Sequence, residues 1–178
     1  MAAASLASGE ARAASDWPIV APGTSLTRTG NRSIPASLRA ALITQPVICD
    51  DGWGDDGAVN SPVTRFFATA DGRTFAAVQC PGADADVTAV FENTDQAIFA
   101  HSFAVQRQGR WLGTTLLDVL NLEPMTGVII SQPPPDSCGL GLDGDRFTYK
   151  LGPDGFVLLK AETLDCASKS WAVTYGAS

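Results

Sequence analysis

The single histidine is the first residue whose chemistry could carry an activity in this 178-residue sequence. His101 lies in a segment where Phe99, Phe103 and Val105 alternate with small residues. A Ser-His-Asp or Cys-His centre would need a nucleophile and an acid beside it. The sequence has no G-x-S-x-G, S-x-x-K or H-E-x-x-H motif. We therefore interpret His101 as a hydrogen-bonded strand residue and assign no catalytic residue.

A glycine-rich acidic loop is the second candidate. Its carboxylates are Asp50, Asp51, Asp55 and Asp56. Carboxylates in a flexible loop could hold Ca²⁺, but the register of an EF-hand fails. With Asp51 at the first ligand position, Trp53 takes the third position, and Pro62 stands where the bidentate Glu belongs. A solvated turn is the favoured interpretation, with Ca²⁺ as the alternative and no other cofactor.

Trp53 indicates a second possible role for the same loop, because glycines flank this indole on both sides. Exposed aromatic side chains anchor interfaces, so we interpret Trp53 and the four aspartates as a binding surface. Trp171 closely follows a cysteine and is expected in the core. Asp143-Gly144-Asp145 reads as a turn. A glycosidase-like carboxylate pair needs a set separation across a cleft, and we assign no such pair.

Four cysteines, with no C-x-x-C motif, form the third group: Cys49, Cys80, Cys138 and Cys166. Four cysteines allow three pairings. We favour Cys49–Cys80 and Cys138–Cys166, since each pair brackets one local β unit. Each would contribute roughly 3–4 kcal/mol in the chain-entropy model. Zinc is disfavoured by the long spacings and the single histidine, and the disulfides predict export.

The charge balance limits the classes of partner that the protein could bind. Lys and Arg total 12 against 19 Asp and Glu, giving a formal net charge of −7. No run of five basic residues occurs, so neither a nucleic-acid groove nor a surface for anionic membranes is indicated. A basic protein partner stays compatible with this charge.

The N-terminal residues 1–15 are rich in alanine and carry a small-x-small pattern at Ala11-Arg12-Ala13. This resembles the end of a secretory signal, and a disordered leader is the alternative. Residues 16–32 read as an extended arm that Trp17 and Ile19 could dock on the core. Residues 33–178 are expected to form a single β-rich domain. The sequence contains no run of 18 apolar residues, so we expect no transmembrane segment.

Turn signals divide that domain into hairpins. Asp71-Gly72 separates strands expected at 63–70 and 73–80, and an Asp-Gly pair is a strong hairpin signal. Gly152-Pro153-Asp154-Gly155 separates strands expected at 146–151 and 156–161. Further strands are expected at 87–92 and 128–131.

Helices are expected at two places. Residues 33–43 carry a helix start in which Pro35 fits the first turn and Leu38, Leu42 and Ile43 share a face. Residues 112–122 have leucines at helical spacing and predict a second short helix. Residues 97–106 alternate and predict a strand, with a helix as the alternative.

These elements predict a mainly β fold, α+β with one or two short helices. Successive antiparallel hairpins would form a small sandwich- or barrel-like domain stapled by disulfides.

The order of motifs in the second half resembles an uncharacterised proteobacterial family of exported proteins, domain-of-unknown-function family 1176. The shared features run from about Arg73 to Tyr175: Cys80 after an apolar strand, Glu123-Pro124-Met125-Thr126-Gly127, Asp136-Ser137-Cys138-Gly139, the strands around Asp143–Tyr149 and Phe156–Leu159, and Asp165-Cys166 followed by Trp171-x-x-x-Tyr175. The resemblance implies a periplasmic or secreted location and no activity.

We therefore expect an exported, non-enzymatic protein-binding or inhibitor-like module, with an envelope protein such as a basic hydrolase as its partner. The first alternative is an envelope hydrolase that uses paired carboxylates on a glycan or peptide. The second is a structural subunit of an envelope assembly.

Overall fold

A computed structural model gives the arrangement of residues 15–29, 34–45, 49, 63–80, 87–107, 109–134, 137–140 and 144–176. The N-terminal leader up to residue 14 and the acidic loop with its candidate residues Asp50, Asp51, Trp53, Asp55 and Asp56 lie outside these ranges. The expected fold class is confirmed: the described part of the protein is mainly β, with antiparallel sheets and one short α-helix.

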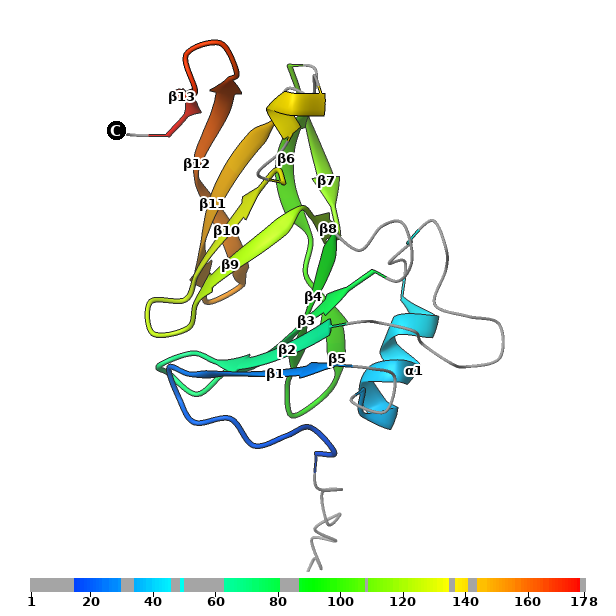
Figure 1. Ribbon diagram of the computed structural model, residues 1–178. Helices are drawn as coiled ribbons and strands as arrows, with labels where there is room; N and C mark the ends of the chain where they lie inside the picture. Colours follow the sequence, from blue (N-terminus) through cyan, green and yellow to red (C-terminus); the bar gives the residue numbers. More distant parts are fainter. Residues whose placement is uncertain are drawn as a thin grey trace, which may run out of the picture.

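A six-stranded sheet forms one layer (Figure 1). Its strands follow the order β1-β2-β3-β4-β5, and β8 also pairs with β4. The strands are β1 (Ser25–Thr29), β2 (Val63–Ala68), β3 (Thr74–Gln79), β4 (Thr88–Asn93), β5 (Ile98–Ala100) and β8 (Leu116–Leu117).

A five-stranded sheet forms the second layer, in the order β13-β12-β11-β10-β9. Its strands are β9 (Val119–Glu123), β10 (Val128–Gln132), β11 (Asp145–Gly152), β12 (Gly155–Asp165) and β13 (Ser170–Tyr175). A separate hairpin consists of β6 (Phe103–Arg107) and β7 (Arg110–Thr114). A 3-10 helix, η3 (Ser137–Leu140), precedes β11.

Both predicted turn signals form hairpins. Asp71-Gly72 joins β2 to β3, and Gly72 has a φ of +87°, a left-handed conformation that glycine adopts without a steric penalty. Pro153-Asp154 joins β11 to β12, with Gly152 and Gly155 paired across the turn. Gly155 has a φ of +130°. The local turn chemistry thus set the pairing of both hairpins.

Side chains alternate between two cores on opposite faces of the six-stranded sheet. From β3, Phe75 and Ala77 face the core between the sheets, whereas Ala76 and Val78 face the helix side. The five-stranded sheet contributes Ile129, Phe147, Tyr149 and Ala161 to the first core. Because β3 and β4 are buried on both faces, their sequences are nearly continuous apolar runs.

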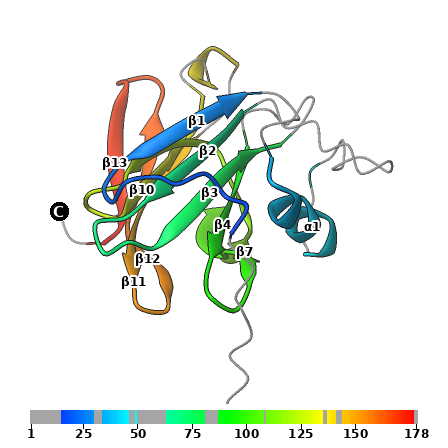
Figure 2. The same ribbon diagram turned by 90° about the horizontal axis from the view of Figure 1, so that it is seen from below.

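The helix α1 (Ala36–Thr44) covers the far side of the six-stranded sheet (Figure 2). It starts later than the predicted residue 33, because Pro35 takes the N-cap position with an extended ψ of 150°. Leu38, Ala41 and Leu42 are buried, whereas Ile43 is 56% exposed and does not share their face.

The expected arm at residues 16–32 is only partly an arm, because Ser25–Thr29 forms β1. Trp17 is buried and packs edge-on against Phe66, with ring centroids 5.6 Å apart. Ile19 is fully exposed, so it does not dock on the core.

The helix predicted at 112–122 is wrong, because these residues form parts of β7, β8 and β9. Leu116, Leu117 and Leu120 have helical spacing, but Leu120 and Leu122 also share one face of a strand and pack on the inter-sheet core. The strand at 97–106 is confirmed and the helix alternative is wrong. This segment is split at His101-Ser102 into β5 and β6, which belong to different sheets.

Both predicted disulfides, Cys49–Cys80 and Cys138–Cys166, are present. The first joins the segment after α1 to the end of β3, and the second joins η3 to the end of β12. Among the described residues, no helix has the length and apolar character needed to cross a membrane.

Candidate functional site

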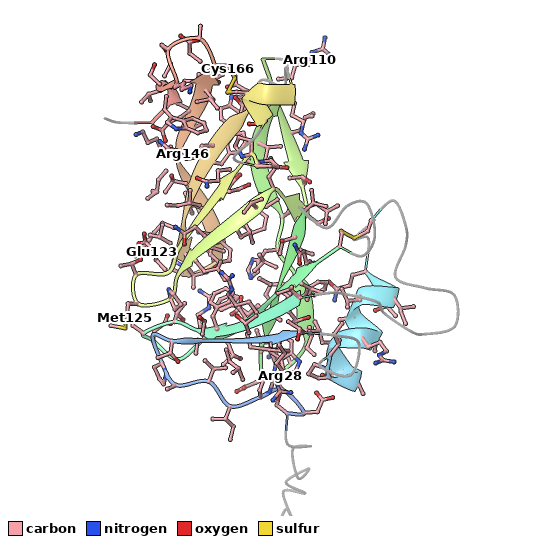
Figure 3. All side chains as sticks on the ribbon, viewed as in Figure 1. Arg28, Arg110, Glu123, Met125, Arg146 and Cys166 are labelled. Atoms are coloured by element: carbon pink, nitrogen blue, oxygen red, sulfur yellow. A yellow bond between two sulfur atoms is a disulfide. The ribbon has the colours of Figure 1, made fainter. Side chains whose placement is uncertain are left out.

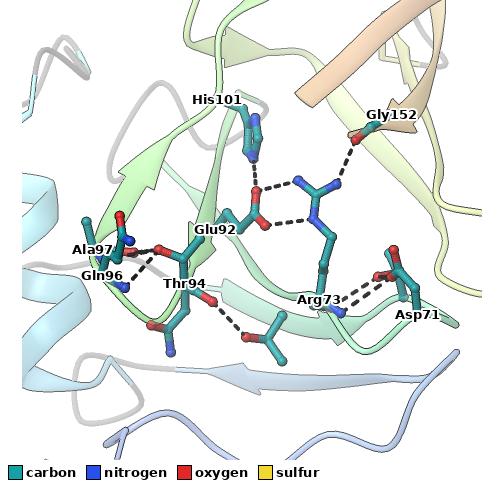
Figure 4. A network of polar contacts seen from close by, with 11 residues as sticks. Asp71, Arg73, Glu92, Thr94, Gln96, Ala97, His101 and Gly152 are labelled. Atoms are coloured by element: carbon teal, nitrogen blue, oxygen red, sulfur yellow. Dashed lines mark hydrogen bonds and ion pairs between the residues drawn. The ribbon is translucent and has the colours of Figure 1, made fainter. Parts of the chain in front are cut away.

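Three polar side chains meet beside the edge of the inter-sheet core (Figure 4). Arg73 donates from Nε to Oε1 of Glu92 and from Nη2 to Oε2, each at 2.8 Å. His101 Nε2 lies 2.9 Å from Oε2 of the same carboxylate. Glu92 and His101 are 4% and 5% exposed, so the carboxylate is almost removed from solvent and held by both partners.

Strand register brings these residues together. Arg73 follows the Asp71-Gly72 turn, and the antiparallel pairing of β3 and β4 places Phe75 opposite Glu92. Pairing of β4 with β5 places Phe99 opposite Glu92 as well. His101 directly follows β5, where its N–H donates to the Val90 carbonyl.

The second sheet completes the network. Arg73 Nη1 donates to the Gly152 carbonyl at 2.7 Å, at the end of β11. The imidazole of His101 also packs against this hairpin, because a Cβ built on Gly155 would lie 3.4 Å from Nδ1. Phe156 contacts the ring edge-on, with centroids 5.0 Å apart. The network therefore joins the two sheets by polar contacts at this edge.

Burial and pairing set the protonation of the network. Burial lowers the pKa of His101 more than its contact with Glu92 raises it. Burial alone would raise the pKa of Glu92, but the hydrogen bonds and charges of Arg73 and His101 hold that pKa below its ordinary value. The hydrogen bond with Glu92 raises the pKa of Arg73. At neutral pH the site therefore contains an ion pair and a neutral imidazole.

Two adjoining cavities form an open groove over this network. The larger has a volume of about 1480 Å³ and extends between the segment at Ser15–Val20 and the hairpin of β4 and β5. The smaller, of about 670 Å³, extends from the network to the β11–β12 turn. Both are lined by Asp71, Arg73, Glu92, Thr94 and Phe99, so we treat them as one groove.

The groove is acidic and partly apolar. Its described carboxylates are Asp16, Asp71, Glu92, Asp95 and Asp154, and Arg73 is the one cationic side chain among the described residues that line it. Ile19 is fully exposed in the groove and Phe99 is 38% exposed. A ligand with cationic and apolar groups matches these walls.

The rim is held in place by local hydrogen bonds. Asp16 accepts the Ser37 N–H at 3.0 Å and also the Ser37 hydroxyl, at the start of α1. Asp71 accepts the Thr69 hydroxyl within the β2–β3 turn, and this bond lowers the pKa of Asp71. Thr94 Oγ1 accepts the Ala97 N–H at 3.1 Å in the β4–β5 turn. The first two of these bonds hold the carboxylates of Asp16 and Asp71 in place before any ligand arrives.

The chemistry of the network is suited to binding more than to proton transfer. A general acid needs a carboxyl pKa raised toward the working pH, and the pKa of Glu92 is shifted in the opposite direction. His101 is committed to Glu92 through Nε2. In the described part of the chain, no group of three His, Cys, Asp or Glu residues is placed to hold a metal ion.

The groove is formed by other residues than those predicted as the binding site. The five predicted binding residues lie outside the described ranges, and sequence reasoning missed Arg73, Glu92, Asp71 and Asp154. The missed signal was a charged Glu92 at the end of the apolar run of β4. Asp145, in the turn predicted at 143–145, accepts the Thr163 hydroxyl at 2.6 Å at the start of β11.

The groove is not lined by Trp171, Trp111 or Tyr175. Trp171 is half-buried and joins neither core. Instead the Arg146 guanidinium stacks 4.3 Å from the centre of its ring. Arg146 Nε also donates to Oε2 of Glu162 at 2.8 Å. Trp111 and Tyr175 are 45% and 48% exposed and contact each other edge-on.

Comparisons with known proteins identify no relative: no family model, no curated protein and no solved structure matches the chain. The resemblance to the exported family stays a prediction. The groove therefore has to be interpreted from its own chemistry.

Proposed function

We propose that this protein is an exported, non-enzymatic protein-binding module that holds a basic segment of a partner protein in the groove. The observation that carries the proposal is the groove itself, where the carboxylates of Asp16 and Asp71, held by hydrogen bonds, line the same walls as the exposed side chains of Ile19 and Phe99. Opposite charges speed the encounter and select the partner, and desolvated apolar contacts supply most of the affinity.

Export is the proposed setting of this function. Two disulfides and no free cysteine among the described residues are typical of proteins that fold in an oxidising compartment. In the periplasm or outside the cell, a basic envelope hydrolase would present the Lys and Arg side chains that the groove accepts, and the module would act as its inhibitor. Glu92 is tied to Arg73 and His101, so it is not suited to the acid role in the alternative of a hydrolase that uses paired carboxylates.

Calorimetry with two synthetic peptides tests the groove. One alternates lysine with leucine and the other alternates glutamate with leucine, so that the two peptides share their apolar residues and differ in the sign of their charge. We expect the lysine peptide to bind and the glutamate peptide not to bind. Binding should weaken as salt is added, because exposed charges are screened over about 10 Å at 0.1 M salt.

Two matched variants locate the binding. Ile19→Ser removes the fully exposed apolar side chain in the groove, and Val157→Ser removes one that is 59% exposed on β12. We expect Ile19→Ser to weaken binding of the lysine peptide about tenfold and Val157→Ser to leave it unchanged. Equal effects of the two variants, or equal binding of both peptides, would contradict the proposal.

A further inference from the structure

The edge strand β13 is a second surface built for contact. It lies at the outer margin of the five-stranded sheet, and in the described part of the chain β12 is the strand that pairs with it (Figure 1). Residues 172–175 are exposed. Its free edge therefore presents backbone N–H and C=O groups that can pair with another strand.

The chemistry of β13 does not protect this edge. Natural edge strands are usually blocked by a charge, a proline or a covering element. Here the β5 edge is covered by the Gln45 side chain, and β1 carries Arg28. The β13 sequence Ser-Trp-Ala-Val-Thr-Tyr has no charge and no proline, and most of its residues favour strands.

The strand is also held ready for pairing. Tyr175 packs edge-on against Trp111 of β7, with ring centroids 5.3 Å apart, which fixes its C-terminal end. Trp171 is held by the Arg146 guanidinium at 4.3 Å, and Cys138–Cys166 ties down the preceding turn. Figure 3 shows Cys166 and Arg110 at this same end of the molecule. A fixed edge has little conformational entropy to lose on pairing.

We propose that β13 pairs antiparallel with β13 of a second copy of this chain across a two-fold axis, joining two five-stranded sheets into one. With Ala172 opposite Ala172 of the second copy at the axis, Trp171 faces Val173 of the second copy, an aromatic and β-branched pair of the kind that stabilises sheets. Ser170 faces Thr174, and none of the six residues of β13 is charged, so no like charges oppose each other along the pair. This matters because each copy carries a net charge of −7, and a self-pairing surface has to be free of like charges.

Charge exchange at the axis tests the pairing. Ala172 is exposed and lies at the axis opposite Ala172 of the second copy, so its replacements in the two copies would face each other. We expect Ala172→Lys and Ala172→Asp each to weaken dimerisation at least about tenfold in sedimentation equilibrium, because like charges would meet. An equimolar mixture should recover the dimer, since Lys then meets Asp.

The matched control is Leu159, which is 48% exposed on the neighbouring strand β12 and lies away from the edge. Leu159→Lys and Leu159→Asp should dimerise like the unchanged protein. A protein that stays monomeric at its highest soluble concentration would overturn the proposal. So would Ala172 variants that dimerise normally, or a mixture that stays monomeric.

Hydrogen exchange gives a readout without substitutions. The β13 amides should exchange more slowly as protein concentration rises, whereas amides of β1, the edge strand of the other sheet, should not change. Equal behaviour of the two strands would place the contact elsewhere. This result is independent of the groove, so the two proposals stand or fall separately.

Discussion

The side chain of Gln45 forms the same two hydrogen bonds with β5 that a neighbouring strand would form. Its Nε2 donates to the Ile98 carbonyl at 2.6 Å, and its Oε1 accepts the Ala100 N–H at 2.6 Å. Both backbone groups belong to the edge of β5 that faces α1. A single amide at the end of the helix thus closes the edge of the six-stranded sheet and fixes the helix against it.

Loss of the Gln45 side-chain amide should lower the stability of the fold. We expect Gln45→Ala to lower the free energy of unfolding by about 2–3 kcal/mol, because two partly buried backbone groups lose their partners. Chemical denaturation measures this value. The control is Thr44→Ala, which removes an exposed bond from Oγ1 to the Ala40 carbonyl and should cost less than about 0.5 kcal/mol. Similar costs for the two variants would show that Gln45 does not support the edge.

Acidification should weaken the fold in a window set by His101. Burial holds the pKa of His101 below its ordinary value of about 6.5, so below that pH the unfolded chain binds a proton that the folded chain does not. Stability should therefore fall as pH falls below about 6.5, and stop falling on this account once the folded histidine is also protonated.

A second window belongs to Glu92, whose pKa in the folded protein is also lowered. Its contribution is present above the ordinary glutamate pKa of about 4.3 and is lost as pH falls through the lower folded pKa. The variant His101→Gln, which can still donate to Glu92, should remove the dependence near pH 6 and keep the one below pH 5. Denaturation series across pH measure both, and an unchanged slope near pH 6 in this variant would contradict the assignment.

The guanidinium of Arg73 should matter by its shape as well as its charge. Arg73→Ala leaves the Glu92 carboxylate and the Gly152 carbonyl without this partner and should cost about 3 kcal/mol. Arg73→Lys keeps the charge but cannot form two parallel bonds to Glu92 and a third to Gly152, so its cost should be intermediate. The exposed Arg107→Ala is the control and should stay within about 0.5 kcal/mol.

The sequence predicted those parts of the fold that short-range chemistry specifies. Asp71-Gly72 and Pro153-Asp154 carry their own turn geometry, so the hairpins on either side could be placed without knowing the rest. The helix wrongly predicted at 112–122 shows the limit, since leucines that fit a helix face also fit short strands when a core lies on one side. Tertiary packing decided between them.

The groove could not be predicted in the same way. Arg73, Glu92 and His101 meet because of the register between β3, β4 and β5, and Gly152 comes from the other sheet. No local pattern encodes that meeting. Glu92 was nonetheless visible as a charge inside an apolar strand, and a buried charge requires a partner.

The disulfides offer a prediction that bears on both stability and location. The two loops span nearly equal lengths, with separations of 31 and 28 residues, so the chain-entropy model gives each roughly 3–4 kcal/mol. The pair Cys49–Cys80 is almost fully buried against α1, at 3% and 0% exposure. We therefore expect replacement of both its residues by alanine to cost more than the same change at Cys138 and Cys166, because it also loses packing in the core beneath the helix.

Peptide mapping without reducing agent, on protein taken from its native source, addresses location. Peptides joined through Cys49–Cys80 and Cys138–Cys166 are expected, since export exposes the chain to an oxidising compartment. Four free thiols in that material would contradict export, although the same residues would still lie within bonding distance in the fold. The proposal of an envelope partner would then be wrong, because that partner depends on the compartment. The proposal that the groove binds a basic segment would remain, because the charge of the groove does not depend on the compartment.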